Sequence, residues 1–172
     1  MIYRLIFIGI ICLAIVLRVV NLSQSPPGVT NDEIGYFSNA YSILKTGNDI
    51  YGRRYPIMFH FEGWPFLPIP VYIRVPIYYL MGLSVFSSRL PNIVAGVFGV
   101  IGVYFLVELL FQNKRLALLS SLLLAISPWH IQFSRSGYDG MLAATFFFIG
   151  VVLALHLYRK KKSFLVVAPL FF

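Results

Sequence analysis

Long apolar runs recur along the chain and are separated by short polar stretches. A helix needs about 20 mainly apolar residues to cross the hydrocarbon core of a bilayer. Runs of this kind predict membrane spans at residues 1–20, 90–111, 116–133 and 140–158. A fifth apolar run begins at residue 163 and continues to residue 172 without a polar flank, so we expect the N-terminal part of a longer protein. The pattern therefore predicts an all-α integral membrane protein, built as a polytopic helix bundle.

The first apolar run has a second interpretation, because a basic start followed by an apolar stretch also describes a signal peptide. No small-residue cleavage site follows it, since the run ends on Arg18-Val19-Val20-Asn21-Leu22. An uncleaved anchor is therefore the favoured interpretation.

Lysine and arginine in the short connections predict the orientation, because cytoplasmic loops are enriched in these residues. The connections at residues 112–115 and 158–162 are basic and contain no acid. Both are expected to be cytoplasmic, which places the N-terminus inside and residues 21–89 outside as a large first outer loop. The connection around residues 134–139 is then also outside. We expect a multi-pass protein of the plasma membrane.

Residues 69–86 are apolar enough to suggest another span, but Pro70, Arg74 and Pro76 interrupt them. A span here would also put the basic residues 159–162 outside, against the positive-inside rule. The segment is therefore predicted to be an interfacial helix along the outer leaflet, with Tyr72, Tyr78 and Tyr79 at headgroup depth.

A second amphipathic helix is predicted at residues 31–46. Thr30 and Glu33 match a capping box, in which each side chain bonds the backbone of the other. Gly47 is a natural helix end. Apolar residues recur between these ends at helical spacing, at Ile34, Phe37, Tyr41 and Leu44.

The pair Asp32-Glu33 is the first candidate for chemistry, because charge close to hydrocarbon is costly and tends to mark function. Capping explains Glu33 well. Asp32 is explained less well, since the helix dipole favours any acid in the first turn by only about 0.3–1 kcal/mol. For Asp32 the catalytic and the capping interpretations stay open. An ionised Asp32 could accept a proton from a substrate hydroxyl.

Three further charged residues are candidates for substrate binding. Glu62 lies among aromatic residues and prolines in the outer loop, where a solvated loop acid is the simpler interpretation. Arg135 offers a planar donor fork that suits phosphate oxygens. The simpler alternative for Arg135 is an interfacial arginine paired with Asp139, on the same side as Asp32-Glu33.

The composition, 59% hydrophobic and 12% charged, also indicates a membrane protein, and cytoplasmic anchors account for much of the +8 net charge without a nucleic-acid partner. Cys12 is the only cysteine, which excludes a disulfide framework. The sequence shows no metal-ligand cluster.

At this point the chain resembles the N-terminal part of polytopic glycosyltransferases that use polyprenyl-phosphate sugars and have the glycosyltransferase C fold. The protein O-mannosyltransferases and the lipid A aminoarabinose transferases belong to this group. The order of several short motifs carries the resemblance: Leu17-Arg18-Val19-Val20-Asn21-Leu22, Asp32-Glu33, residues 41–47, Ser88-Arg89-Leu90-Pro91, Pro128-Trp129-His130 and Ser134-Arg135.

The resemblance implies a hexosyl- or pentosyltransferase with its site at the outer membrane face. It implies that Asp32 is the general base or the carboxylate that orients the acceptor, and that Glu33 assists it. It also implies that Arg135 engages the lipid phosphate, and Asp139 follows Arg135 as in the family pattern. Transfer would go to a hydroxyl of a glycan, lipid or protein with inversion at the anomeric carbon. No cofactor is assigned, and participation of a divalent metal is left open. The rival hypotheses are a transporter or flippase fragment and a non-catalytic membrane subunit.

Overall fold

The computed structural model describes residues 1–22 and 24–159, so the apolar run at residues 163–172 lies outside the described residues. Within them, three helices are long and apolar enough to cross a membrane: α1 (Ile2–Val19), α5 (Val85–Phe111) and α8 (Asp139–Arg159). The predicted polytopic, all-α membrane architecture is confirmed, and the predicted first and fourth spans match α1 and α8 closely.

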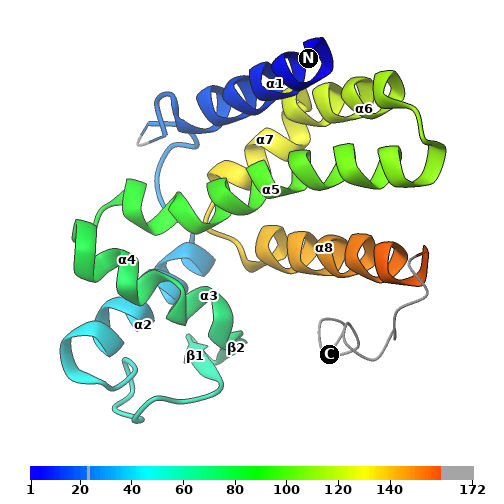
Figure 1. The fold of residues 1–172 in the computed structure, drawn as a ribbon. Coiled ribbons are helices and arrows are strands. Elements are labelled where there is room, and N and C mark those ends of the chain that lie inside the picture. Colours follow the sequence, from blue (N-terminus) through cyan, green and yellow to red (C-terminus); the bar gives the residue numbers. More distant parts are fainter. Residues whose placement is uncertain (23, 160–172) are drawn as a thin grey trace.

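Helix α5 is the centre of the bundle. In Figure 1 it runs between α8 on one side and α1 and α6 (Lys114–Ile126) on the other, and it contacts all three. Gly99 lets α5 approach the imidazole of His130 closely. A Cβ built on Gly99 would lie only 3.1 Å from that ring. The bundle core also contains Ala14, Val100 and Ala117, each fully buried.

The prediction that the second span begins at residue 90 is wrong, because α5 begins at Val85. Ser84 and Ser87 form a capping box that starts the helix, with the Ser87 amide donating to Ser84 Oγ at 3.1 Å. Pro91 therefore lies inside the helix, whereas the predicted span places it next to the first residue. The last two residues of the predicted interfacial helix at 69–86 therefore belong to the first turn of α5.

The prediction of one continuous third span is also wrong. The segment is broken into α6 and α7 (Pro128–Arg135), which are bent by 57°. Proline has no backbone N–H and disfavours helical geometry in the residue before it. Ser127 accordingly has an extended backbone (φ −61°, ψ 118°) at the break. The bend turns α7 toward the end of the bundle where the outer loop lies.

The outer loop folds into a small subdomain at one end of α5 (Figure 1). Helix α2 (Asn31–Thr46) has the predicted bounds and the predicted capping box. A hairpin of β1 (Phe59–Phe61) and β2 (Trp64–Phe66) follows, which the sequence analysis did not predict. Then come α3 (Pro68–Tyr72) and α4 (Arg74–Met81), so the predicted interfacial segment is a pair of short helices. Buried side chains from all these elements form one core: Tyr36, Phe37, Ala40, Ile43, Phe59, Phe66, Val71 and Tyr78.

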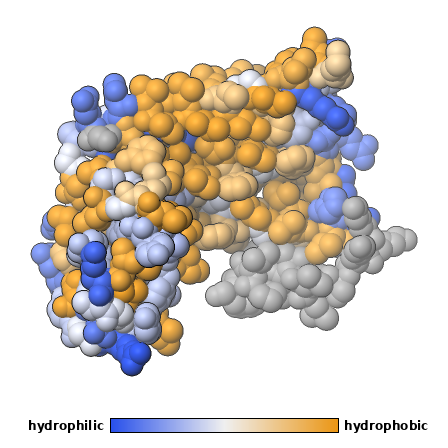
Figure 2. Space-filling view, turned by 60° about the vertical axis from the view of Figure 1, so that its left-hand side comes forward, coloured by the Kyte–Doolittle hydropathy of each residue, from blue (hydrophilic) through white to orange (hydrophobic). Residues whose placement is uncertain are grey.

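The surface of the helix bundle is largely apolar. In Figure 2, orange side chains cover most of the visible bundle, and polar side chains gather over the loop subdomain and at the ends of the helices. Leu123 on α6 and Phe98 on α5 are each at least half exposed. Apolar exposure of this extent is what a surface in contact with lipid requires.

Candidate functional site

Glu33 is the buried centre of the candidate site. It is 1% exposed, and its carboxylate accepts hydrogen bonds from three parts of the chain. Arg89 donates from Nε to Oε1 at 2.8 Å and from Nη2 to Oε2 at 3.1 Å. The amide of Gly137 donates to Oε1 at 2.7 Å, and the amide of Thr30 donates to Oε2 at 3.1 Å. Glu33 therefore joins α2 to α5 and to the connection between α7 and α8.

Arg89 anchors the connection between α1 and α2. Its guanidinium is fully buried, and beyond Glu33 it donates to the carbonyls of Leu22, Pro26 and Gly28 at 3.3, 3.0 and 2.7 Å. Arginine suits this position because its planar fork can bind a carboxylate with two bonds and still reach neighbouring acceptors. The ion pair and these backbone bonds hold the N-terminus of α2 against α5.

The environment of Glu33 favours its ionised form. Burial by itself would raise the pKa of this carboxyl, but the hydrogen bond from Arg89 and the amides of Thr30 and Gly137 outweigh it and hold the pKa below its usual range. Glu33 is therefore charged at neutral pH and carries no proton to exchange. It fits a positioning role better than a proton-transfer role.

Acid stability is expected to depend on Glu33. The pKa is lower in the folded protein than in the unfolded chain, where it is about 4.3. Ionised Glu33 thus stabilises the fold above about pH 4.3, and this contribution is lost as the pH falls from there through the folded pKa. The unfolding temperature of the purified full-length protein should therefore fall as the pH is lowered through this range. Glu33→Gln should have a lower unfolding temperature at neutral pH, and that temperature should fall less steeply with pH. A Glu33→Gln profile as steep as that of the unchanged protein would contradict the assignment.

The peptide of Gly137 is held from both sides. Its amide binds Glu33, and its carbonyl accepts from Arg74 Nη2 at 2.9 Å. The fit is close, because a Cβ built at this position would lie 2.8 Å from the ring of Phe37 and 3.0 Å from Glu33 Cγ. The connection before α8 is therefore fixed relative to α2.

Arg74 is the second buried cation of the site. It is fully buried with its guanidinium 5.6 Å from the ring centroid of Tyr36 and 5.3 Å from that of Phe37, and Asn92 Oδ1 accepts from it at 3.1 Å. Burial lowers the pKa of Arg74 to about 10, so it stays charged at neutral pH. Arg74 thus adds a positive charge beside Glu33.

Arg135 lies close to the same region, as the sequence predicted, but it does not pair with Asp139. Its Nη1 donates to the Leu17 carbonyl at 2.9 Å, and its Nε and Nη2 donate to the Ser25 carbonyl at 3.1 and 2.8 Å. The alternative of an Arg135–Asp139 pair is therefore wrong within the described residues. Its acceptors are instead one backbone carbonyl in the last turn of α1 and one in the connection that follows α1.

Asp32 and Asp139 are accessible, in contrast to Glu33. Asp32 is exposed in the first turn of α2 and makes no hydrogen bond or ion pair with any of the residues that the structure describes. Asp139 is half-buried at the start of α8. Burial, and then the negative charge of Asp139, raise the pKa of Tyr36, so its hydroxyl stays protonated next to this acid.

Glu62 occupies the turn of the β1–β2 hairpin rather than the cluster around Glu33. Glu62 and Gly63 both have positive φ angles, 49° and 84°, as a two-residue hairpin turn requires. The Glu62 side chain is exposed. Turn geometry accounts for this position, and the structure does not bring Glu62 into contact with the other candidates.

A small cavity of about 120 Å³ lies beside the ion pair. Its polar wall comes from α2, α5 and the connection after α7, and its lining consists of Pro26, Pro27, Thr30, Glu33, Arg89, Gln132, Phe133, Ser136 and Tyr138. The buried carboxylate of Glu33 and the buried guanidinium of Arg89 thus both line one small cavity. Among residues 1–22 and 24–159, no group of three or more His, Cys, Asp or Glu side chains has the arrangement to hold a metal ion.

The sequence analysis gave no role to Arg74, Arg89 or Asn92, which position the site. The sequence did contain one indication of these residues. An arginine inside an apolar segment is costly and is therefore expected to have a binding partner. Their partners are mostly backbone carbonyls and one carboxylate distant in sequence, and spacing along the chain does not reveal such contacts.

The comparisons with known proteins give one match. The family model described as dolichyl-phosphate-mannose-protein mannosyltransferase matches residues 65–172, which is more than half of the chain. No curated protein and no solved structure matches. The matched range contains Arg74, Arg89, Arg135 and Asp139, and it begins after Asp32 and Glu33.

Proposed function

Because the chain belongs to the dolichyl-phosphate-mannose-protein mannosyltransferase family, we propose that it transfers a sugar from a polyprenyl-phosphate donor to an acceptor hydroxyl at the outer membrane face. The family match carries this proposal. A membrane glycosyltransferase with a lipid-linked donor also agrees with the helix bundle and its largely apolar surface.

Asp32 is the general base in this proposal. It is the exposed acid of the pair, whereas the carboxylate of Glu33 is already bound by Arg89, Gly137 and Thr30. Asp32 takes the proton of the acceptor hydroxyl as the hydroxyl oxygen attacks the anomeric carbon. The bond from that carbon to the phosphate oxygen breaks on the opposite side, and the lipid phosphate leaves with the electron pair. The product is an inverted glycoside.

Glu33 is a positioning residue in this mechanism. Its bonds fix the first turn of α2, and Asp32 is the neighbouring residue in that turn. A base must be within hydrogen-bond reach of the proton that it takes, so its placement is part of catalysis. The buried ion pair provides the rigid support that such a placement needs.

Positive charge around the site supports an anionic donor. Arg74, Arg89 and Arg135 are buried there. Arg89 binds Glu33, Arg74 lies within electrostatic range of Glu33, and Arg135 lies within electrostatic range of Arg89. Arg135 uses three of its five N–H groups on the carbonyls of Leu17 and Ser25, which leaves two that can reach a phosphate oxygen. Preorganised cations stabilise the charge that develops on the departing phosphate.

The location in the plasma membrane with a cytoplasmic N-terminus is part of the same proposal. The basic residues Lys114, Arg115 and Arg159 lie at the end of the bundle opposite the loop subdomain (Figure 1). Cytoplasmic loops favour such residues. The candidate site then faces outward.

The proposal is tested by donor specificity. Membranes containing the full-length protein are incubated with an acceptor and with labelled sugars on polyprenyl phosphate or on a nucleoside diphosphate. We expect transfer, with release of polyprenyl phosphate, only from the lipid-linked sugars. Direct transfer from a nucleotide sugar in membranes stripped of polyprenyl phosphate would contradict the proposal, as would folded protein that uses no lipid-linked sugar.

A further inference from the structure

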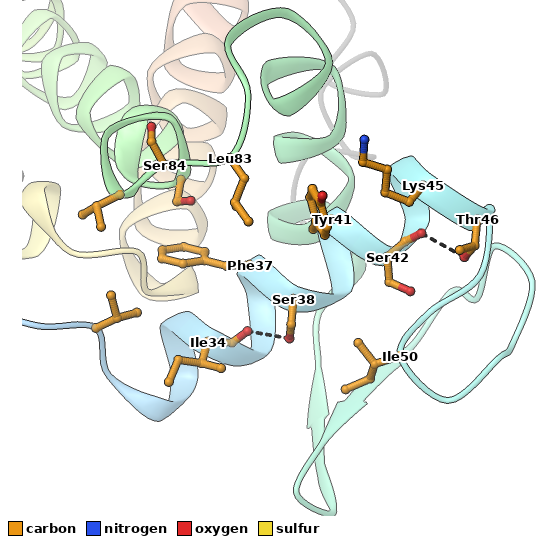
Figure 3. Close-up of a pocket in the computed structure, with 13 residues that line it drawn as sticks. Ile34, Phe37, Ser38, Tyr41, Ser42, Lys45, Thr46, Ile50, Leu83 and Ser84 are labelled. Atoms are coloured by element: carbon orange, nitrogen blue, oxygen red, sulfur yellow. Dashed lines mark hydrogen bonds between the residues drawn. The ribbon is translucent and has the colours of Figure 1, made fainter.

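A groove of about 820 Å³ follows α2 on a face away from the carboxylate of Glu33 (Figure 3). Its other wall is the segment that joins α4 to α5. The lining residues are Val29, Ile34, Phe37, Ser38, Tyr41, Ser42, Lys45, Thr46, Ile50, Leu83, Ser84, Val85 and Ser88. The volume lies within the range of about 300–1,000 Å³ that is usual for small-molecule pockets.

The hydroxyl groups in this groove are largely occupied. Ser38 Oγ donates to the Ile34 carbonyl at 2.6 Å, and Thr46 Oγ1 donates to the Ser42 carbonyl at 2.9 Å, as the dashed lines in Figure 3 show. Ser88 Oγ is bonded to the Tyr78 hydroxyl at 2.7 Å. The wall therefore presents mainly carbon, and it suits a hydrocarbon chain better than a polar ligand.

Lys45 is the one charged side chain among the residues that line the groove. It lies in the last turn of α2, is exposed, and holds its ammonium 5.5 Å from the ring centroid of Tyr41. An apolar groove that ends at a single cation is complementary to an amphiphile with an anionic head.

The groove also lies where the bilayer surface is expected. Leu83 lines it and is half exposed, and Leu80 and Met81 just before it are exposed as well. These residues directly precede α5, which is long and apolar enough to span the membrane. An exposed apolar surface at the start of a span contacts lipid, so the groove is continuous with the lipid-facing surface.

We propose that this groove binds one acyl chain of an anionic phospholipid of the bilayer, with the lipid phosphate next to Lys45. The proposal does not depend on the transferase activity. The groove shares no lining residue with the cavity beside Glu33 and Arg89, so its occupant does not need to react. A bound lipid would hold α2 at the membrane surface from the side opposite the ion pair.

The test uses fluorescence quenching by phospholipids with brominated chains. The full-length protein carries Trp64→Phe and Trp129→Phe, and Tyr41→Trp places a single reporter in the groove. In vesicles, we expect brominated phosphatidylglycerol to quench this reporter more strongly than brominated phosphatidylcholine at equal mole fraction. Lys45→Gln should lower the preference for phosphatidylglycerol by about fivefold, which is the effect on affinity of one lysine near an anionic surface. Lys45→Arg keeps the positive charge and should keep the preference.

A reporter at Leu123→Trp, on the lipid-facing side of α6, measures the preference of bulk lipid. The proposal is overturned if the two reporters show equal preference or if Lys45→Gln changes nothing. It is also overturned if neither lipid quenches the reporter in the groove, because lipid chains then do not enter the groove. Displacement of the brominated lipid by added polyprenyl phosphate would assign the groove to that carrier instead.

Discussion

Asp32→Asn is expected to lower the rate of sugar transfer by about 100- to 10,000-fold, the usual contribution of a general base. Asparagine has nearly the same shape but cannot accept the proton of the acceptor hydroxyl. The measurement is the initial rate of transfer from a lipid-linked sugar by the full-length protein, normalised to the amount of folded protein.

This variant separates catalysis from stability. Asp32 is exposed and its side chain makes no hydrogen bond with the described residues, so its structural contribution is limited to the helix dipole, about 0.3–1 kcal/mol. The unfolding temperature of Asp32→Asn should therefore stay close to that of the unchanged protein. Asn31→Ala, in the same turn and also exposed, is the matched control and should retain activity. Normal activity of Asp32→Asn would exclude Asp32 as the base.

Arg89→Met is expected to destabilise the fold by roughly 3–5 kcal/mol, because it leaves the carboxylate of Glu33 buried without its counterion. Three backbone carbonyls lose their donor as well. The effect should appear as a lower unfolding temperature in detergent and as poor accumulation in membranes. Lys114, an exposed lysine 4.0 Å from the half-buried Glu108, provides the control, since loss of this ion pair by Lys114→Met should cost much less.

A double variant distinguishes loss of the ion pair from simple loss of packing. Removing both charges with Glu33→Gln and Arg89→Met should cost clearly less than the sum of the two single changes, because the penalty for an uncompensated charge disappears. Strictly additive costs would contradict a strong interaction between Glu33 and Arg89.

The elements that local sequence determines were predictable. The bounds of α2 follow from Thr30, Glu33 and Gly47, whose effects act within one helical turn, and α1 and α8 follow from their apolar length. For the second and third predicted spans, the effect of a proline was misjudged. Pro128 breaks the third span, whereas Pro91 lies inside α5, and the residue type alone does not distinguish the two outcomes.

The candidate site was predictable only as a set of residues. Sequence indicated that Asp32, Glu33 and Arg135 lie on one side of the membrane, but not that Glu33 binds Arg89 while Arg135 binds backbone carbonyls. Those partners lie between 56 and 118 residues away along the chain. Local periodicity carries no information about contacts at that range. The functional roles of Asp32, Glu33, Glu62, Arg135 and Asp139 remain predictions.

The contacts of Glu33 imply an order of assembly. Its partner in α5 follows it by 56 residues and its partner before α8 by 104 residues. Helix α2 is synthesised before either partner, because chains grow from the N-terminus. Its carboxylate must then stay in water until α5 has been inserted and the chain has passed Gly137. The first turn of α2, which carries Asp32, would therefore reach its final packing only after the last of these segments has been synthesised.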